Sequence, residues 1–151
     1  MKKLILSIAI ILAGFSMSFA NRLDDIKDRA IASFHKEFYQ ATEMSWAQSN
    51  NFVQVTFSIN KQIMYAYYDF QGNLIGLVHH ILTTSLPENL QKDIKKNYGG
   101  YWVSELFEVT NEEGTHFVIQ LRNADETLVL HSEGKVSWHT YATYKNKSTD
   151  L

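Results

Sequence analysis

The sequence contains no cysteine and a single proline, Pro87, among its 151 residues. The absence of cysteine excludes a disulfide framework, thiolate catalysis and a lipid-modified cysteine anchor. A chain of this size without disulfides must rely on its hydrophobic core for stability. Aromatic residues make up 13% of the chain, with nine Phe, eight Tyr and three Trp, and we expect most of them to form that core.

Long hydrophobic runs are also missing, since no segment approaches the ~20 apolar residues that a membrane-spanning helix needs. The longest run covers residues 4–15, follows two lysines and precedes the pattern Ser18-Phe19-Ala20. A charged start, a short apolar stretch and small residues at the cleavage site are typical of a signal peptide. We therefore predict a signal peptide over residues 1–20 and a mature protein that is periplasmic or secreted, with no membrane attachment after cleavage.

Neither sign of charge is in large excess, because 14 basic and 16 acidic residues give a net charge of -2. Loss of Lys2 and Lys3 with the leader makes the mature chain more acidic, and the remaining charges are mixed along the sequence. Nucleic-acid binding calls for a concentrated basic surface. We therefore expect no nucleic-acid partner.

Two segments have the periodicity of amphipathic helices. The first covers residues 23–38, with apolar residues spaced by three and four and charged residues opposite them. The second is predicted to begin at Ser85-Leu86-Pro87-Glu88, where Ser85 caps the helix and Glu88 completes a capping box. Gly99-Gly100 ends it.

The rest of the chain alternates apolar and polar residues with period two, which predicts half-buried antiparallel strands. The expected strands are 44–47, 52–58, 64–68, 74–82, 102–109, 116–121, 127–131 and 135–140. The order is one helix and four strands, twice, and short sequence matches recur at offsets of about 60 residues. We predict an α+β fold of two tandem helix-plus-four-strand repeats, about 22–82 and 83–140, that form one antiparallel sheet with helices on one face. A single domain spans 21–143, and 144–151 is a flexible tail.

A family resemblance rests on the end of the first helix (Phe34, Phe38, Ala41), on Trp46, on the Ala66-Tyr67-Tyr68-Asp69-x-x-Gly72 hairpin, on Leu86-Pro87 and on Tyr98-Gly99-Gly100-Tyr101. This pattern resembles the PepSY-like family of exported bacterial proteins, which have the fold of the beta-lactamase inhibitor protein. One departure is Gln40, which stands where that family often has proline. The resemblance implies a periplasmic domain that binds proteins or peptides without enzymatic activity, and it supplies no catalytic residues.

The six histidines do not form a metal-binding pattern. His79 and His80 are adjacent, so on a strand their side chains point to opposite faces. His131 and His139 flank a hairpin, but we expect them to lie several residues out of register. We therefore predict no metal and no cofactor.

Asp69 and His79 offer the one alternative with catalytic character, a small-ligand binder or enzyme of the cone-shaped α+β type with a pocket around these two residues. Asp69 also begins the sequence Asp69-Phe70-Gln71-Gly72, and aspartate at the first position of a turn accepts hydrogen bonds from the following amides. We favour the turn role. No nucleophile or phosphate-binding motif occurs, and we expect no enzyme.

Aromatic residues on the strands exceed what one buried face needs. If Val53, Val55 and Phe57 face the helices, Phe52 lies on the opposite, open face. We predict an open sheet face that binds an unidentified protein or peptide of the periplasm, with inhibition of a hydrolase as the sharpest version. The candidate binding residues are Trp46, Phe52, Tyr65, Tyr67, Trp102, Trp138 and Tyr141. The alternative is that these side chains only shield the sheet or pair across strands.

Overall fold

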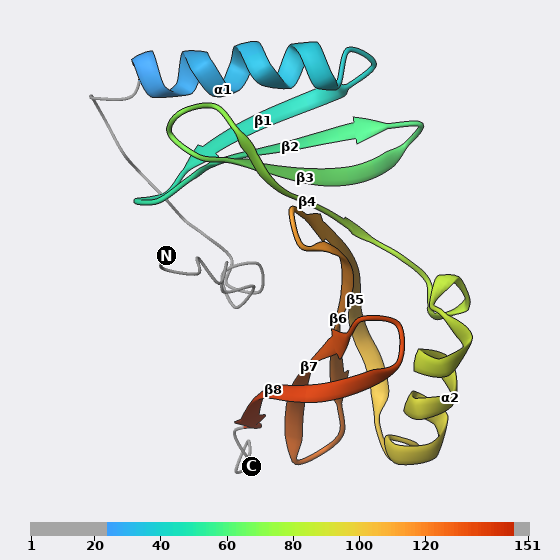
Figure 1. Cartoon of the computed structure of the whole chain (residues 1–151). Coiled ribbons are helices and arrows are strands. Elements are labelled where there is room, and N and C mark those ends of the chain that lie inside the picture. Colours follow the sequence, from blue (N-terminus) through green and yellow to red (C-terminus); the bar gives the residue numbers. More distant parts are fainter. Residues whose placement is uncertain (1–23, 147–151) are drawn as a thin grey trace.

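The computed structural model describes residues 24–146, which form one eight-stranded antiparallel sheet and two α-helices (Figure 1). The strands lie in the sheet in the order in which they occur in the chain. The elements are α1 (Asp24–Glu37), β1 (Thr42–Gln48), β2 (Val53–Ile59), β3 (Gln62–Tyr68), β4 (Leu74–His80), the short 3-10 helix η2 (Thr83–Ser85), α2 (Glu88–Asn97), β5 (Trp102–Asn111), β6 (Gly114–Arg122), β7 (Glu126–Glu133) and β8 (Ser137–Lys145).

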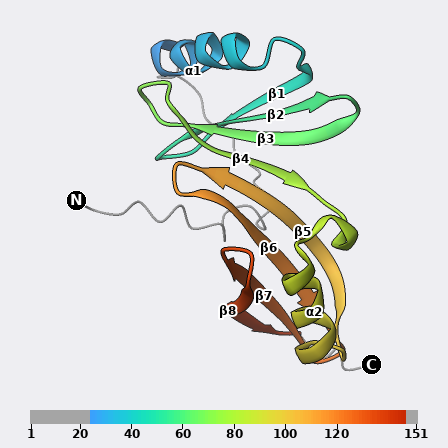
Figure 2. The ribbon, with the colours of Figure 1, turned by 45° about the vertical axis from the view of Figure 1, so that its right-hand side comes forward.

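Both α-helices lie on the same side of the sheet. The sheet curves strongly, so that α1 covers β1 to β3 and α2 covers β5 to β8 from the convex side (Figures 1 and 2). The strand register agrees, because paired residues in antiparallel strands share a face. The concave side carries neither helix.

The core beneath α1 forms where the spacing of apolar residues on the helix meets the period-two pattern of the strands. Ala30 and Phe34, one helical turn apart, are buried against a strand cluster of Val53, Val55, Phe57, Ala66 and Tyr68. The rings of Phe34 and Phe57 meet edge to face, with centroids 4.9 Å apart. Tyr68 also donates a hydrogen bond of 3.2 Å to Glu37, which ties the end of the helix to β3.

The core beneath α2 contains Leu86 and Leu90 from the helical segment, packed on side chains from β5 to β8. The predicted cap of this helix is wrong. Ser85 lies in η2, Pro87 immediately precedes the helix, and no side-chain hydrogen bond caps its first turn. Glu88 instead pairs with Lys92 one turn later, at 2.6 Å. Packing of the apolar face, rather than a capping box, therefore secures α2.

The turn between β3 and β4 lies directly under α1. Gly72 has a φ of +87°, and a Cβ at this position would lie 3.1 Å from the backbone oxygen of Arg29. Only glycine combines that backbone conformation with so close an approach. The close contact between Gly72 and Arg29 therefore holds α1 against the turn between β3 and β4.

The predicted fold class is confirmed as α+β with a single antiparallel sheet and two helices on one face. The last strand runs on to Lys145, further than expected, and takes in two residues that the sequence placed in the tail. The order of elements is a helix followed by four strands, twice, but a true internal repeat stays a prediction. The predicted signal peptide lies outside the described residues.

Candidate functional site

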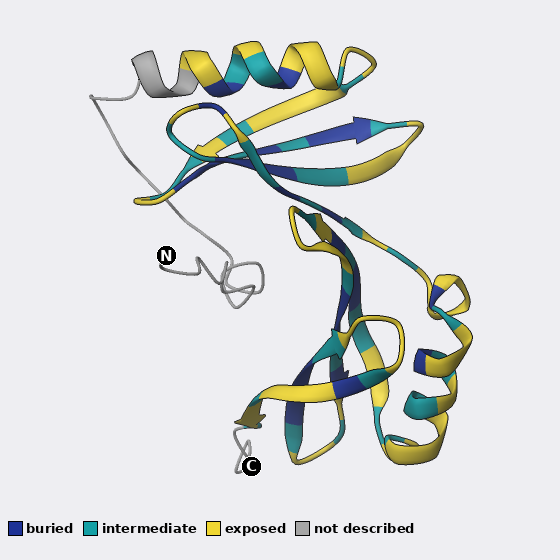
Figure 3. Ribbon diagram, viewed as in Figure 1, coloured by how far each residue is buried: buried dark blue, intermediate teal, exposed yellow. Residues whose placement is uncertain are grey.

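The concave face of the sheet has an apolar centre. Seven buried side chains contact one another there. They are Phe52, which precedes β2, and Tyr67, Val78, Phe107, Val109, Val118 and Val129 from β3 to β7. The outer strands β1 and β8, in contrast, are largely exposed (Figure 3). The concave face thus has a packed middle and accessible margins.

Three of the predicted aromatic residues lie on this face in the packed middle. Phe52 and Tyr67 are buried, with ring centroids 5.4 Å apart in an edge-to-face arrangement, and Tyr65 packs beside them half-buried. Burial, and then the neighbouring Tyr65, raise the pKa of Tyr67 above its usual range. These side chains are therefore more core than accessible surface, although their predicted face is right.

Trp46 and Trp138 do not lie on the concave face, which corrects their placement among the open-face residues. Trp46 pairs with Val55 and packs against Phe34 under α1, with ring centroids 5.4 Å apart. Trp138 is 6% exposed beneath α2, and its indole nitrogen donates a hydrogen bond of 3.1 Å to the carbonyl of Leu90. Both tryptophans join a helix to the sheet.

The accessible aromatic side chains of the concave face lie near its end in the second half of the chain. Trp102 pairs with Arg122, Arg122 with Thr127, and Thr127 with Tyr144, so these four residues form one line across β5 to β8. We call this line the aromatic row. Trp102 is 56% and Tyr144 54% exposed, and Arg122 is exposed between them. At the usual strand spacing the row is about 14 Å long.

Tyr141 lies close to this row, on the same face. It occupies a bulge in β8, is 44% exposed, and stacks in parallel on His131 with ring centroids 4.3 Å apart. Sequence reasoning included Trp102 and Tyr141 but missed Arg122 and Tyr144. Arg122 follows the alternation of β6 one residue beyond the predicted strand, so a longer strand would have placed it on this face. Tyr144 could not be placed in this way, because the bulge at Tyr141 changes the alternation in β8.

The histidines follow the register of the strands. His79 faces the helix side opposite Met64, and His80 faces the concave side opposite Phe107, as predicted. The prediction for His131 and His139 is wrong, because the two residues are direct cross-strand partners. Within residues 24–146 no group of three or more His, Cys, Asp or Glu side chains could hold a metal ion.

The alternative pocket would require Asp69 and His79 to lie together. His79 pairs with Met64, five residues from Asp69 along the chain, which separates the two by roughly 16 Å in an extended strand. Asp69 instead closes its turn, accepting hydrogen bonds from the backbone of Gln71 and from the backbone and side chain of Asn73. Burial acts to raise the pKa of Asp69, but these bonds together hold it below its ordinary value. The turn role is confirmed.

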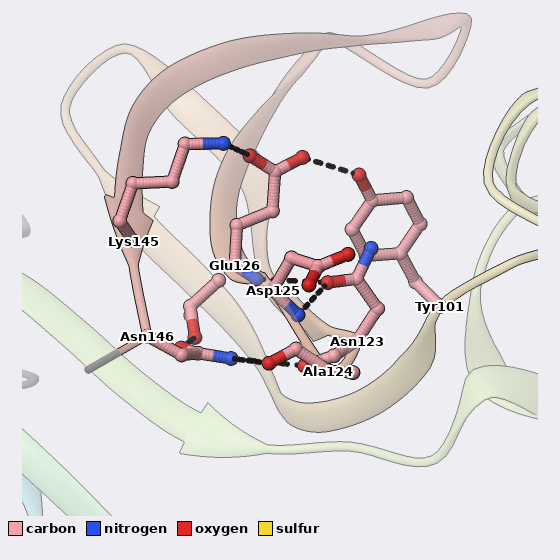
Figure 4. Close-up of polar contacts among 8 residues, drawn as sticks. Tyr101, Asn123, Ala124, Asp125, Glu126, Lys145 and Asn146 are labelled. Carbon is pink, nitrogen blue, oxygen red and sulfur yellow. Dashed lines mark hydrogen bonds and ion pairs between the residues drawn. The ribbon is translucent and has the colours of Figure 1, made fainter. Parts of the chain in front are cut away.

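A polar cluster lies beyond the aromatic row, where the turn between β6 and β7 meets the start of β5 and the end of β8 (Figure 4). Tyr101 donates to one oxygen of Glu126 at 2.7 Å, and Lys145 donates to the other at 2.8 Å. Asn146 bonds the backbone oxygen of Asn123 at 2.9 Å. The bond from Lys145, followed by that from Tyr101, lowers the pKa of Glu126, and each carboxylate oxygen accepts one of these bonds. The cluster thus holds the end of β8 in place.

Comparison with known proteins places the fold but not the activity. No family model and no curated protein matches the chain. Among solved structures it is similar to a DUF2874 family protein from Bacteroides uniformis, with a TM-score of 0.68 and 12% identity over 84% of this chain and 90% of that one. It is also similar to a BLIP-like protein from Bacteroides fragilis, with a TM-score of 0.64 and 16% identity over 89% and 95%.

A third neighbour, from Bacteroides eggerthii, carries a provisional periplasmic assignment and has a TM-score of 0.69 at 11% identity, over 83% of this chain and 90% of that one. At such identities the similarity defines a shared BLIP-like fold. Within the described part of the chain, neither helix is long and apolar enough to cross a membrane.

Proposed function

We propose that this protein is a non-catalytic binding module that holds a protein partner against the concave face of its sheet. The observation that carries the proposal is the aromatic row, in which Trp102 and Tyr144 stand exposed on the face that neither helix covers. Exposed tryptophan, tyrosine and arginine are the side chains that dominate binding energy at protein interfaces. Tyr141 extends the same surface.

A protein suits this surface better than a small molecule. The row spans four strands, about 14 Å, whereas a small ligand needs a concave pocket that encloses most of its surface. Arg122 stands between the two aromatic side chains and makes no ion pair within residues 24–146. A carboxylate on the partner would complement it. We therefore assign the row to a partner that presents an acidic side chain within an apolar surface.

The proposal extends to location and family. A short apolar leader after two lysines supports export, and the periplasmic assignment of one structural neighbour agrees with it. The order of helix and strands supports two tandem units and a PepSY-like relationship. The BLIP-like fold of another neighbour supports inhibition of a hydrolase as the sharpest form of the proposal. The turn role of Asp69, and the hydrogen bonds that hold both oxygens of Glu126, support a role without catalysis.

Affinity capture tests the proposal. Mature protein, residues 21–151, is immobilised and exposed to periplasmic extract of its native host, and retained proteins are identified by mass spectrometry. We expect a saturable partner that is lost from the double variant Trp102→Ala with Tyr144→Ala. Tyr39→Ala is the matched control, because Tyr39 is highly exposed but lies after α1, outside the sheet.

Charge reversal sharpens this experiment. Arg122→Glu should weaken capture of the same partner, and the weakening should shrink at high salt, since the complementary charge is screened there. A partner retained by the concave-face variants and lost from the Tyr39 control would contradict the proposal. Unchanged thermal unfolding of each variant is required for either reading.

A further inference from the structure

Several histidines lie on the concave face, among and next to the residues of its apolar centre. His80 on β4 pairs with Phe107, Phe107 with Val118, Val118 with His131, and His131 with His139 on β8. His116 stands on the same face, opposite Val109. Four of the six histidines of the chain therefore share one face of the sheet. We call them the histidine set: His80, His116, His131 and His139.

The two central members of the set are half-buried among apolar side chains. His131 is covered by the stacked ring of Tyr141, and its Nε2 atom is buried without a hydrogen-bond partner in the described part of the chain. His131 lies directly opposite the buried Val118, and His116 lies two residues from Val118 along β6, on the same face. A proton on either ring would place a charge next to the packed middle of the face, where desolvation is costly.

Three carboxylates lie against the set, two beside its outer members and one, Glu113, beside His116. Glu105 lies 3.4 Å from His80, and Glu133 lies 2.7 Å from His139. Burial lowers the pKa of His116, although Glu113 opposes the effect. Burial also lowers the pKa of His131, and the neighbouring His116 lowers it further. The central pair therefore resists protonation, and a proton on His116 further disfavours one on His131.

We propose that His116 and His131 make the concave face acid-responsive: uncharged and tightly packed near neutral pH, but cationic and loosened around β6 to β8 in acid. For the partner, which rests on the proposed function, the consequence is release, because Arg122, Thr127 and Tyr144 of the aromatic row lie on the strands that loosen. The direction follows from linkage. A histidine whose folded-state pKa lies below its unfolded value of about 6.5 leaves the protein fully stabilised above that pH. Stability declines as the pH falls through the unfolded value, until the folded pKa is passed.

Two measurements on the free protein test this acid response without any partner. In the first, imidazole chemical shifts are followed by NMR from pH 8 to pH 4.5. We expect His116 and His131 to titrate at lower pH than the exposed His35 of α1, which serves as an internal reference. Midpoints for the central pair at or above that of His35 would overturn the proposal.

In the second, thermal unfolding is recorded at pH 7.5 and pH 5.0, above the range in which most carboxylates titrate. The wild-type protein should melt at a lower temperature at pH 5.0, and His116→Phe and His131→Phe should each reduce that difference. Phenylalanine keeps an aromatic ring, so the stacking on Tyr141 can persist in the second variant. His35→Gln should retain the wild-type difference in melting temperature. An equal difference in all four proteins would refute the proposed acid response. If no partner is captured at pH 7.5, only the proposed function fails, since both measurements use the protein alone.

Discussion

Trp138 gives the sharpest test of the distinction between core and surface tryptophans. Replacing it by phenylalanine removes the hydrogen bond from its indole nitrogen to Leu90, which costs about 0.5–1.5 kcal/mol. The smaller ring also leaves a void under α2 that costs on the order of 1–2 kcal/mol. Together these losses predict a destabilisation of about 1.5–3.5 kcal/mol. For a domain of this size that is a fall in melting temperature of roughly 5–17 °C.

Trp102 supplies the matched control. Its side chain is exposed, so Trp102→Phe should change the free energy of unfolding by less than about 0.5 kcal/mol. Urea unfolding of the two variants, followed by far-ultraviolet circular dichroism, measures both values against the wild-type protein. Equal destabilisation by the two substitutions, or none by Trp138→Phe, would refute the assignment of Trp138 to the core.

Three further substitutions test local features of the fold. Gly72→Ala should destabilise the protein by about 2–4 kcal/mol, because alanine strains the positive φ and its Cβ meets the backbone of Arg29; a normal melting temperature would contradict the close approach. Ser85→Ala should change stability by less than about 0.3 kcal/mol, since no side-chain bond caps α2, whereas a loss near 1 kcal/mol would restore the capping box. Asp69→Ala should destabilise the turn above pH 4 but converge on the wild-type stability in stronger acid. The contribution of the carboxylate is fully present above its unfolded pKa and is lost as the pH falls through its lowered folded pKa. An undiminished difference at pH 2 in a pH series of melts would contradict this.

The strand faces could be predicted from sequence where alternation is unbroken. Phe52 and Val53 are neighbours of opposite face, and the pattern Val53, Val55, Phe57 assigned the helix side correctly. In β3 alternation shows only that Tyr65 and Tyr67 share a face, and the pairing with β2 is what places that face on the concave side. What alternation does not contain is the degree of burial, because the curvature of the sheet packs Tyr67 on a face that carries no helix.

The faces in β8 could not be predicted because the strand contains a bulge. Leu130 pairs with Thr140 but Val129 pairs with Ala142, so Tyr141 is an extra residue and the alternation changes phase there. Trp138 therefore faces α2 while Tyr141 lies on the concave side. The hairpin turn also falls later than expected, which brings His131 and His139 into direct register.

The sequential order of the eight strands has a consequence for folding kinetics. Every strand pairs with the strand before or after it in the chain, so each hairpin can close before the next segment is available. The one long connection, between β4 and β5, contains η2 and α2 and so contributes local contacts of its own. Such a topology has low contact order for a β-rich protein, and low contact order accelerates folding. The chain can therefore form its sheet progressively from the N-terminal end, strand upon strand, as a polypeptide does when it emerges from a narrow channel.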